Sequence, residues 1–140
     1  MLIDSCLQFW GYEVKSISFE LSDAFGKIRE FRILPEFSVS LSEPENEIYK
    51  VQLSVSIKSS EEKPQPFDLN VTMIGRFSIQ MDNEDEVLKQ TLLRDNTVAI
   101  MFPFVRSIVA SLTVAANIPP LLLPVINVSE TLKNNPDSRS

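Results

Sequence analysis

The side chains of this sequence that could do chemistry are mostly carboxylates. They cluster in EPENE (43–47) and DNEDE (82–86), whose oxygens could in principle bind a cation. Neither stretch has the spacing of a calcium-binding loop. We therefore interpret the first as a solvated turn and the second as the start of a helix, and we expect no metal and no other cofactor.

The residue types that most catalytic and zinc sites require are missing. The chain has no histidine, and Cys6 is its single cysteine, which removes the commonest general base and the usual Cys/His zinc ligands. The three glycines, Gly11, Gly26 and Gly75, are too scattered for a phosphate-binding loop or a dinucleotide fingerprint. We do not expect an enzyme.

The composition is typical of one globular domain in a reducing compartment. The chain has 140 residues, 44% hydrophobic and 23% charged, with a net charge of −6. An acidic chain without a basic cluster is a poor partner for nucleic acid or anionic lipid. The first residues lack a basic region and a long apolar run, so we expect no secretory signal and a cytoplasmic location. We expect one domain over residues 1–134 and a disordered polar tail over residues 135–140.

Strict alternation of apolar and polar residues predicts a long β-hairpin in the middle of the chain. YKVQLSVSIK (49–58) and FDLNVTMIGRFSIQM (67–81) each place their apolar residues on one face. The segment between them, SSEEKPQP (59–66), contains prolines that cannot continue a ladder. The two runs are therefore expected to pair as antiparallel strands.

Two further strands are expected nearer the N-terminus, in SISFEL (16–21) and EFSVSL (36–41). Tyr12 and Val14 are out of phase with the first of these strands, which indicates a bulge. Each strand has one apolar and one polar face. That pattern predicts a four-stranded antiparallel sheet covered on one side only.

After residue 81 the periodicity changes to that of helices. We expect a short helix near 84–93, a second N-cap in DNT (95–97), and a long helix over 97–116. Pro103 lies about two turns into the long helix, where a kink or restart is expected.

The long helix is apolar or small on both faces, which predicts that both faces are covered. Pro103, Arg106 and the Pro119-Pro120 pair argue against a transmembrane span. One sheet can cover only one face of a helix, so a second copy of the chain is expected on the other. The alternative is that this small-residue face is simply exposed. The interface residues that we expect are Phe104, Ser107, Ala110, Ser111 and Val114.

The run NIPPLLLPVIN (117–127) contains three prolines, which exclude a regular helix. Its apolar residues therefore lie on an extended or turning loop. Such residues either plug the protein's own core or form an adhesive surface. A short final helix over 128–134 could follow.

Several of these segments resemble the SecB family of protein-export chaperones. IMFPFVRSIV (100–109) is similar to the family's helix motif, a hydrophobic pair followed by Phe-Pro-aromatic-x-Arg, and NIPPLLLPVIN (117–127) resembles its lid-like Pro- and Leu-rich segment. KSISFE (15–20), LPEF (34–37) and PFDLNVTMIGRFSI (66–79) are similar to its first, second and fourth strands. The resemblance extends over roughly residues 12–128.

The resemblance implies an α+β fold, with a four-stranded antiparallel sheet, one long and one short helix on one face, and assembly as a dimer of dimers. It implies an ATP-independent chaperone that binds unfolded polypeptides, such as preproteins for export, and passes them to the translocase motor SecA. The clients would bind apolar side chains on a crossover loop and on the lid; the alternative is that these residues only extend the core. The expected client-binding residues are Phe25, Phe31, Ile33, Leu34, Phe67, Ile118, Leu121, Leu122, Leu123 and Val125.

The sequence departs from the family pattern at the surface that would bind SecA. Glu20 matches one acidic docking residue, whereas Ser16 and Asn70 replace acidic residues at two other positions. We therefore expect weak or absent SecA binding, and a chaperone dedicated to one client, such as an antitoxin, stays an alternative. A small-ligand-binding protein and a purely structural oligomer subunit are two further alternatives.

Overall fold

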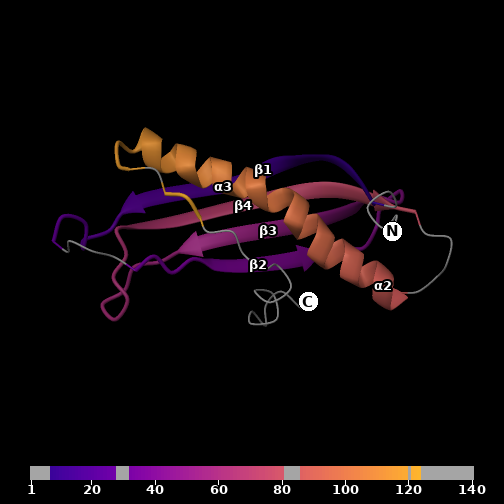
Figure 1. The fold of residues 1–140 in the computed structure, drawn as a ribbon, viewed down its shortest axis with the longest axis horizontal. Helices are drawn as coiled ribbons and strands as arrows, with labels where there is room; N and C mark the ends of the chain where they lie inside the picture. Colours follow the sequence, from indigo (N-terminus) through magenta and orange to yellow (C-terminus); the bar gives the residue numbers. More distant parts are fainter. Residues whose placement is uncertain (1–6, 28–31, 81–85, 120, 124–140) are drawn as a thin grey trace.

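The computed structural model describes residues 7–27, 32–80, 86–119 and 121–123. A four-stranded antiparallel sheet forms one layer, and a single long helical stretch crosses one of its faces diagonally (Figure 1). The strand order is β1-β4-β3-β2, so β1 and β2 are the edges. The elements in chain order are β1 (Leu7–Leu21), β2 (Glu36–Leu41), β3 (Tyr49–Ile57), β4 (Phe67–Ile79), α2 (Glu86–Thr91), the π-helical turn η1 (Leu92–Asn96) and α3 (Thr97–Ala115).

The predicted hairpin is confirmed. β3 and β4 pair from Tyr49 opposite Phe77 to Ile57 opposite Leu69 without a break in register. Because side chains alternate across a strand, the apolar set of each strand lies on one face, beneath the helix. The strand predicted in 36–41 is β2, with the same bounds.

The bulge predicted in the first strand is also confirmed. The pairing of β1 with β4 shifts register between Val14 and Ser16, and again between Phe9 and Tyr12. These shifts bring Tyr12 and Val14 onto the same face as the apolar residues that follow, because their partners on β4 point into the core. The strand begins at Leu7, nine residues earlier than the sequence pattern indicated.

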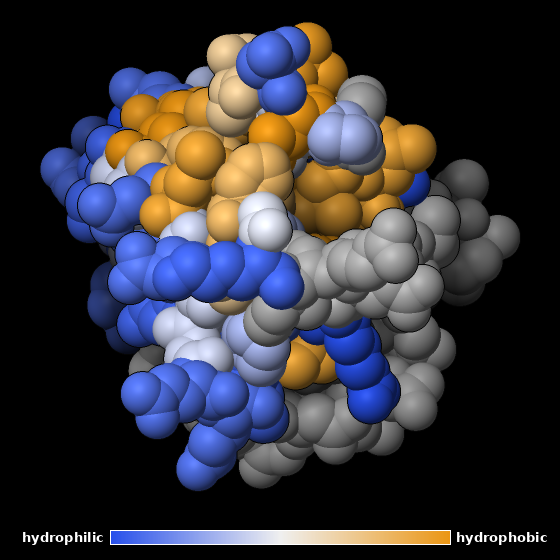
Figure 2. Space-filling model, turned by 90° about the vertical axis from the view of Figure 1, so that its left-hand side faces the viewer, coloured by the Kyte–Doolittle hydropathy of each residue, from blue (hydrophilic) through white to orange (hydrophobic). Residues whose placement is uncertain are grey.

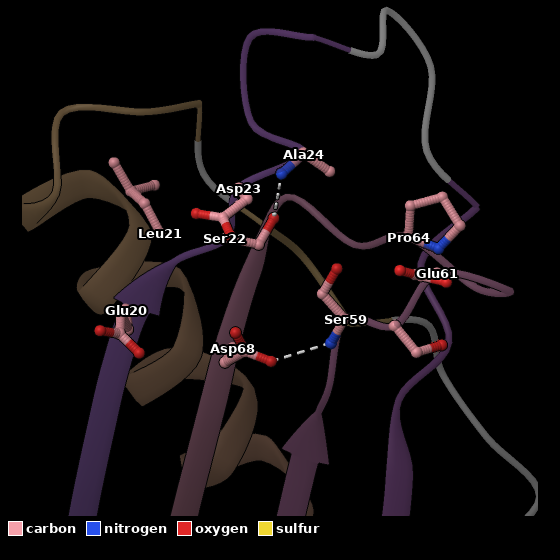
Figure 3. Close-up of a pocket in the computed structure, with 10 residues that line it drawn as sticks. Glu20, Leu21, Ser22, Asp23, Ala24, Ser59, Glu61, Pro64 and Asp68 are labelled. Atoms are coloured by element: carbon pink, nitrogen blue, oxygen red, sulfur yellow. Dashed lines mark hydrogen bonds between the residues drawn. The ribbon is translucent and has the colours of Figure 1, made fainter.

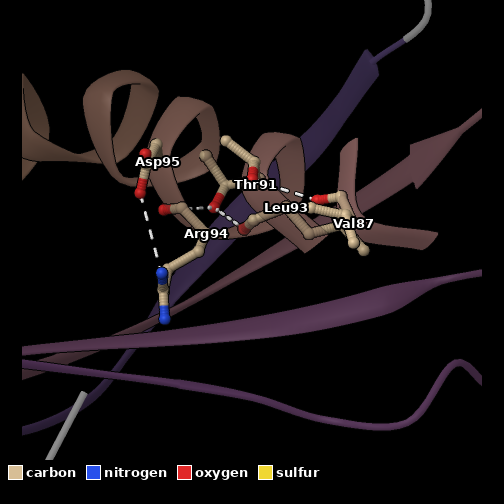
Figure 4. A network of polar contacts seen from close by, with 6 residues as sticks. Val87, Thr91, Leu93, Arg94 and Asp95 are labelled. Carbon is tan, nitrogen blue, oxygen red and sulfur yellow. Dashed lines mark hydrogen bonds and ion pairs between the residues drawn. The ribbon is translucent and has the colours of Figure 1, made fainter. Parts of the chain in front are cut away.

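The second N-cap predicted in 95–97 is wrong. Asn96 has helical backbone angles and makes no capping hydrogen bond, so α2, η1 and α3 form one continuous helical stretch. The Thr97 hydroxyl instead donates to the carbonyl oxygen of Leu93 within that stretch (Figure 4). A π turn inserts an extra residue into the helix. As a result Leu92 and Leu93 are both buried, as are Thr97 and its neighbour Val98.

A kink or restart was predicted at Pro103, and the restart is wrong. Pro103 lies inside α3, with its ring exposed, and the helix continues to Ala115. Proline removes one backbone hydrogen bond, and packing of the neighbouring turns on the sheet offsets that loss. The stretch Val87–Ala115 is long and apolar enough to cross a bilayer by length and composition. In this fold, a stripe of its side chains lies in the core of the sheet.

The core lies between the apolar face of the sheet and α3. The two layers come close together at Gly75: a Cβ atom there would lie 2.8 Å from the sulfur of Met101 on α3, and 2.9 Å from the ring of Phe77 on the same strand. Phe37 packs edge-on against Phe102 of α3, with ring centroids 5.6 Å apart. The predicted domain bounds 1–134, the final helix over 128–134 and the tail over 135–140 fall partly or wholly outside the described residues.

Candidate functional site

An acidic cavity of about 640 Å³ lies at the end of β1 (Figure 3). Four of its lining residues are Glu20, Asp23, Glu61 and Asp68. One oxygen of Asp68 accepts a hydrogen bond of 2.8 Å from the backbone N–H of Ser59. Within the described part of the chain, no three Asp, Glu, Cys or His side chains are grouped so that they could hold a metal ion. The carboxylates that line the cavity therefore do not form such a group.

Two segments that carry predicted client-binding residues start at this same end of the molecule. One is the crossover segment, residues 22–35, between β1 and β2; the other is the lid segment, residues 118–126, after α3 (Figure 1). Figure 2 views this end directly: hydrophobic residues gather in its upper part, and hydrophilic residues lie along its left and lower left side. The described residues of the two segments, 22–27, 32–35, 118, 119 and 121–123, belong to no helix or strand, so their side chains are presented by loops.

Among its described residues, the crossover segment presents the aromatic ring of Phe25 and the aliphatic side chains of Ile33 and Leu34. Phe25 is 42% exposed, whereas Ile33 and Leu34 are half-buried. Ile33 and Leu34 also line a cavity of about 350 Å³ with Lys58 and Lys63. Phe31 lies outside the described residues.

The three leucines of the lid segment have different environments. Leu123 is fully buried and belongs to the core, Leu121 packs partly against the core, and Leu122 is 68% exposed. Ile118 is half-buried against the same core. Val125 lies outside the described residues.

Two polar contacts from α3 hold the lid segment. The Nε of Arg106 donates to the carbonyl oxygen of Leu123 at 2.8 Å, and the backbone N–H of Leu121 donates to the hydroxyl of Thr113 at 2.9 Å. Thr113 is fully buried and donates in turn to the carbonyl oxygen of Ala110 at 2.9 Å. Neither contact was predicted: Arg106 was expected to argue against a membrane span and to match the arginine of the helix motif, and Thr113 had no predicted role. Both residues fix which leucine points outward.

Phe67, at the start of β4, lies in the core instead of on an open surface. It is 3% exposed, and its ring stacks at a tilt on that of Phe19 with centroids 5.0 Å apart. In the arrangement described here it supports the end of the sheet from which the crossover segment leaves. A polypeptide could reach it only if neighbouring side chains moved.

The predicted interface residues lie on the face of α3 that points away from the core. Phe104 is 37% and Val114 56% exposed, Ser107 and Ser111 are exposed, and Ala110 is half-buried. The Phe104 ring lies 4.8 Å from that of Tyr12, centroid to centroid. This contact joins the outer face of the helix to the edge strand β1.

The edge strand extends that apolar surface. Tyr12, Val14, Ile17 and Leu21 point to the helix side of the sheet and are each 38–48% exposed. A contiguous apolar surface of this kind on a protein typically marks an interaction site.

The opposite face of the sheet is polar and carries little charge in its middle. The exposed Ser16 pairs with Thr72, and the Ser54 and Thr72 hydroxyls lie 2.9 Å apart. Asn70 donates to the Thr72 hydroxyl at 3.3 Å. Glu20 is exposed at the acidic end, next to Asp68 on β4. Glu20 thus lies toward the end of β1, whereas Lys15, next to Ser16, donates to the Oε1 of Gln52 on this face at 3.4 Å.

Comparison with known proteins identifies the family. Residues 7–137 match the family model described as "SecB: Preprotein translocase subunit SecB". The chain belongs to the SecB family. The SecB relatives include the protein-export protein SecB of Anaplasma phagocytophilum, 34% identical over 139 residues, with 85% of each chain covered. An uncharacterized protein of Methanocaldococcus jannaschii is 33% identical over 131 residues, covering 91% of this chain and 83% of the relative.

A solved structure shares the SecB-like fold described above. It is the Mycobacterium tuberculosis Rv1957 SecB-like chaperone in complex with a ChAD peptide from the Rv1956 HigA1 antitoxin. The TM-score is 0.69 at 15% sequence identity, and the match covers 88% of this chain and 92% of that one. The predicted four-stranded antiparallel sheet with one long helix is therefore confirmed, and family membership supports a chaperone role.

Proposed function

We propose that this SecB-family protein is an ATP-independent holdase that binds unfolded polypeptides, with preproteins for export as its clients. The observation that carries the proposal is the exposure of large apolar side chains on irregular segments, above all Phe25 and Leu122. Phe25 belongs to the crossover segment and Leu122 to the lid segment, two loops that start where β1 and α3 end, at the same end of the molecule (Figure 1).

In the proposed mechanism, chaperone and client bury apolar side chains against each other. An unfolded chain exposes apolar side chains, and each one that docks on Phe25 or Leu122 removes apolar area from water on both partners. Such contacts are not directional, so they tolerate many client sequences. Binding to the unfolded form lowers the concentration of free unfolded chain by mass action, and no nucleotide is required.

The arrangement of the lid segment suits this role. Leu123 anchors the segment in the core, while Arg106 and Thr113 hold its backbone. The loop therefore loses its conformational entropy when the protein folds, and not when a client binds. This raises the affinity for the client. Leu122 stays available as the contact residue.

We further propose a homo-oligomer, a tetramer built as a dimer of dimers, that acts in the cytoplasm. The apolar surface formed by β1 and the outer face of α3 supports this proposal, because it would be costly to leave in water. We propose that SecA binds weakly, through Glu20 alone among the three docking positions considered. Clients of a single type, such as an antitoxin, are a narrower form of the same activity.

A small-ligand-binding protein was one of the alternatives from the sequence, and the acidic cavity gives that alternative little support. A ligand site of that kind is mostly apolar with a few converging polar groups. The acidic cavity of about 640 Å³ is lined mainly by carboxylates and small polar residues. The holdase is therefore the function that the described surface supports best.

Suppression of aggregation tests the proposal. The purified protein, without nucleotide, is mixed with a chemically unfolded polypeptide, and light scattering is followed after dilution. Wild type should suppress scattering, and the double variant Phe25→Ser/Leu122→Ser should lose most of that activity. Val87→Ser is the matched control, because Val87 is 78% exposed at the start of α2, near the other end of the helix. Wild-type protein that leaves aggregation unchanged would contradict the proposal.

A further inference from the structure

Gln65 is an almost completely buried polar residue in the loop between β3 and β4. It is 1% exposed although it lies between two prolines in a loop rich in charged residues. A buried amide is costly unless its polar atoms are hydrogen-bonded. Both atoms of the Gln65 side-chain amide are bonded, and their partners belong chiefly to the crossover segment.

The side chain of Gln65 holds the end of the crossover segment. Its Nε2 donates to the carbonyl oxygen of Arg32 at 2.8 Å, and its Oε1 accepts from the backbone N–H of Leu34 at 3.0 Å. In an extended chain, the carbonyl of one residue and the N–H of the residue two positions later point to the same side. The Gln65 amide therefore bonds to this segment as a neighbouring strand would.

The backbone of Gln65 holds the start of the same segment. Its carbonyl oxygen accepts a hydrogen bond from the Ser22 hydroxyl, and the backbone N–H of Ser22 donates to the carbonyl oxygen of Pro66 at 3.1 Å. The N–H of Gln65 donates to the Ser59 hydroxyl at 2.9 Å, which ties the arrangement to the end of β3. One residue thus bonds to both ends of the crossover segment.

We propose that Gln65 is a positioning residue for client binding: it closes the crossover segment at both ends and so sets the arrangement of Phe25, Ile33 and Leu34. The inference rests on the holdase function proposed above. Ile33 and Leu34, which the Gln65 amide brackets, line the cavity of about 350 Å³ beside β2. With the anchor in place this cavity is formed before a client binds.

The expected size of the effect follows from the hydrogen bonds that would be lost. A net hydrogen bond changes an equilibrium constant by roughly twofold to tenfold. Without the anchor, the segment must be ordered each time a client binds, and that cost is subtracted from client affinity. We expect client dissociation to become about tenfold faster.

The test uses Gln65→Met, which keeps the length of the side chain and removes its hydrogen bonds. Gln52→Met is the matched control, since Gln52 is half-buried on the polar face of β3, away from the crossover segment. Two quantities are measured in each full-length variant: amide hydrogen exchange at Leu34 and the dissociation rate of a fluorescent unfolded polypeptide. In Gln65→Met both should rise about tenfold, and in Gln52→Met neither should change. Unchanged exchange at Leu34, or faster exchange with unchanged client dissociation, would overturn the proposal.

A second variant covers the case in which Gln65→Met fails to fold. Ser22→Ala removes the bond to the Gln65 carbonyl, and Ser40→Ala on the exposed face of β2 is its control. Client dissociation should rise about threefold in the first and stay constant in the second; equal rates in the two would refute the anchor. If wild type binds no client at all, the proposed function fails, while exchange at Leu34 still reports separately on the anchor.

Discussion

The lid segment allows a prediction in which two adjacent leucines give opposite results. Leu123 is fully buried and Leu122 is 68% exposed. Truncating a buried leucine costs about 3–5 kcal/mol, because it removes apolar contacts and leaves a cavity. At about 2–4 °C per kcal/mol for a chain of this size, Leu123→Ser should lower the melting temperature by about 10 °C or more.

Leu122→Ser should leave the melting temperature almost unchanged and weaken client binding. Full burial of a leucine contributes about 1.5–3 kcal/mol. About two thirds of the Leu122 side chain is available to a client, so its loss removes about 1–2 kcal/mol, or a fivefold to thirtyfold faster dissociation. Calorimetry gives the melting temperature, and stopped-flow competition with unlabelled client gives the rate. The reasoning is refuted if Leu122→Ser melts early while it holds clients as tightly as wild type.

Three further predictions concern assembly, partner binding and packing. Ser111→Glu places a charge on the exposed face of α3, and light scattering should report smaller assemblies than in wild type; an unchanged mass would exclude this face from the interface. The double variant Ser16→Asp/Asn70→Glu should bind purified SecA at least several-fold more tightly than wild type in a salt-dependent titration, because close interfacial charge pairs contribute about 1.5 kcal/mol or more. Tight binding by wild type that the double variant does not strengthen would contradict this prediction. Gly75→Ala should lower stability to denaturant by about 1–3 kcal/mol, because its Cβ would collide with Met101; a gain in stability would show that Met101 moves aside without cost.

Most of the sheet could be predicted because its pattern is set by burial on one face. The alternation in 36–41, 49–58 and 67–81 led to β2, β3 and β4. β1 was predicted too short. Its first residues include Trp10, which is 56% exposed and donates a hydrogen bond to Ser78 on the polar face. Apolar residues there lie on both faces of the strand, so the sequence does not alternate between apolar and polar residues.

The helical part was predicted less well. Capping residues and proline indicate a helix end only where no tertiary packing opposes it. Asn96 and Thr97 could end one helix and start another, but packing of Leu92 and Leu93 on the sheet favours a π turn. Pro103 is accommodated because its ring faces outward. Tertiary packing overrode both local signals.

The sequence predicted which segments carry the candidate site, but not which of their side chains are exposed. The prolines predicted the position of the lid loop. Three consecutive leucines do not indicate which of them is buried, because this depends on the contacts that Arg106 and Thr113 make with the loop backbone. Gln65 had no signal at all, since a glutamine between prolines is typical of an exposed turn. Its burial depends on segments more than thirty residues away in the sequence.

The central claim, that this protein binds unfolded chains and not folded ones, is tested most directly by one titration. A single labelled polypeptide, with a folded form and a variant that stays unfolded under the same conditions, is titrated with the purified protein without nucleotide, and fluorescence anisotropy is recorded. We expect saturable binding of the unfolded variant and none of the folded form. Equal binding of both forms, or no binding of either, would contradict the account.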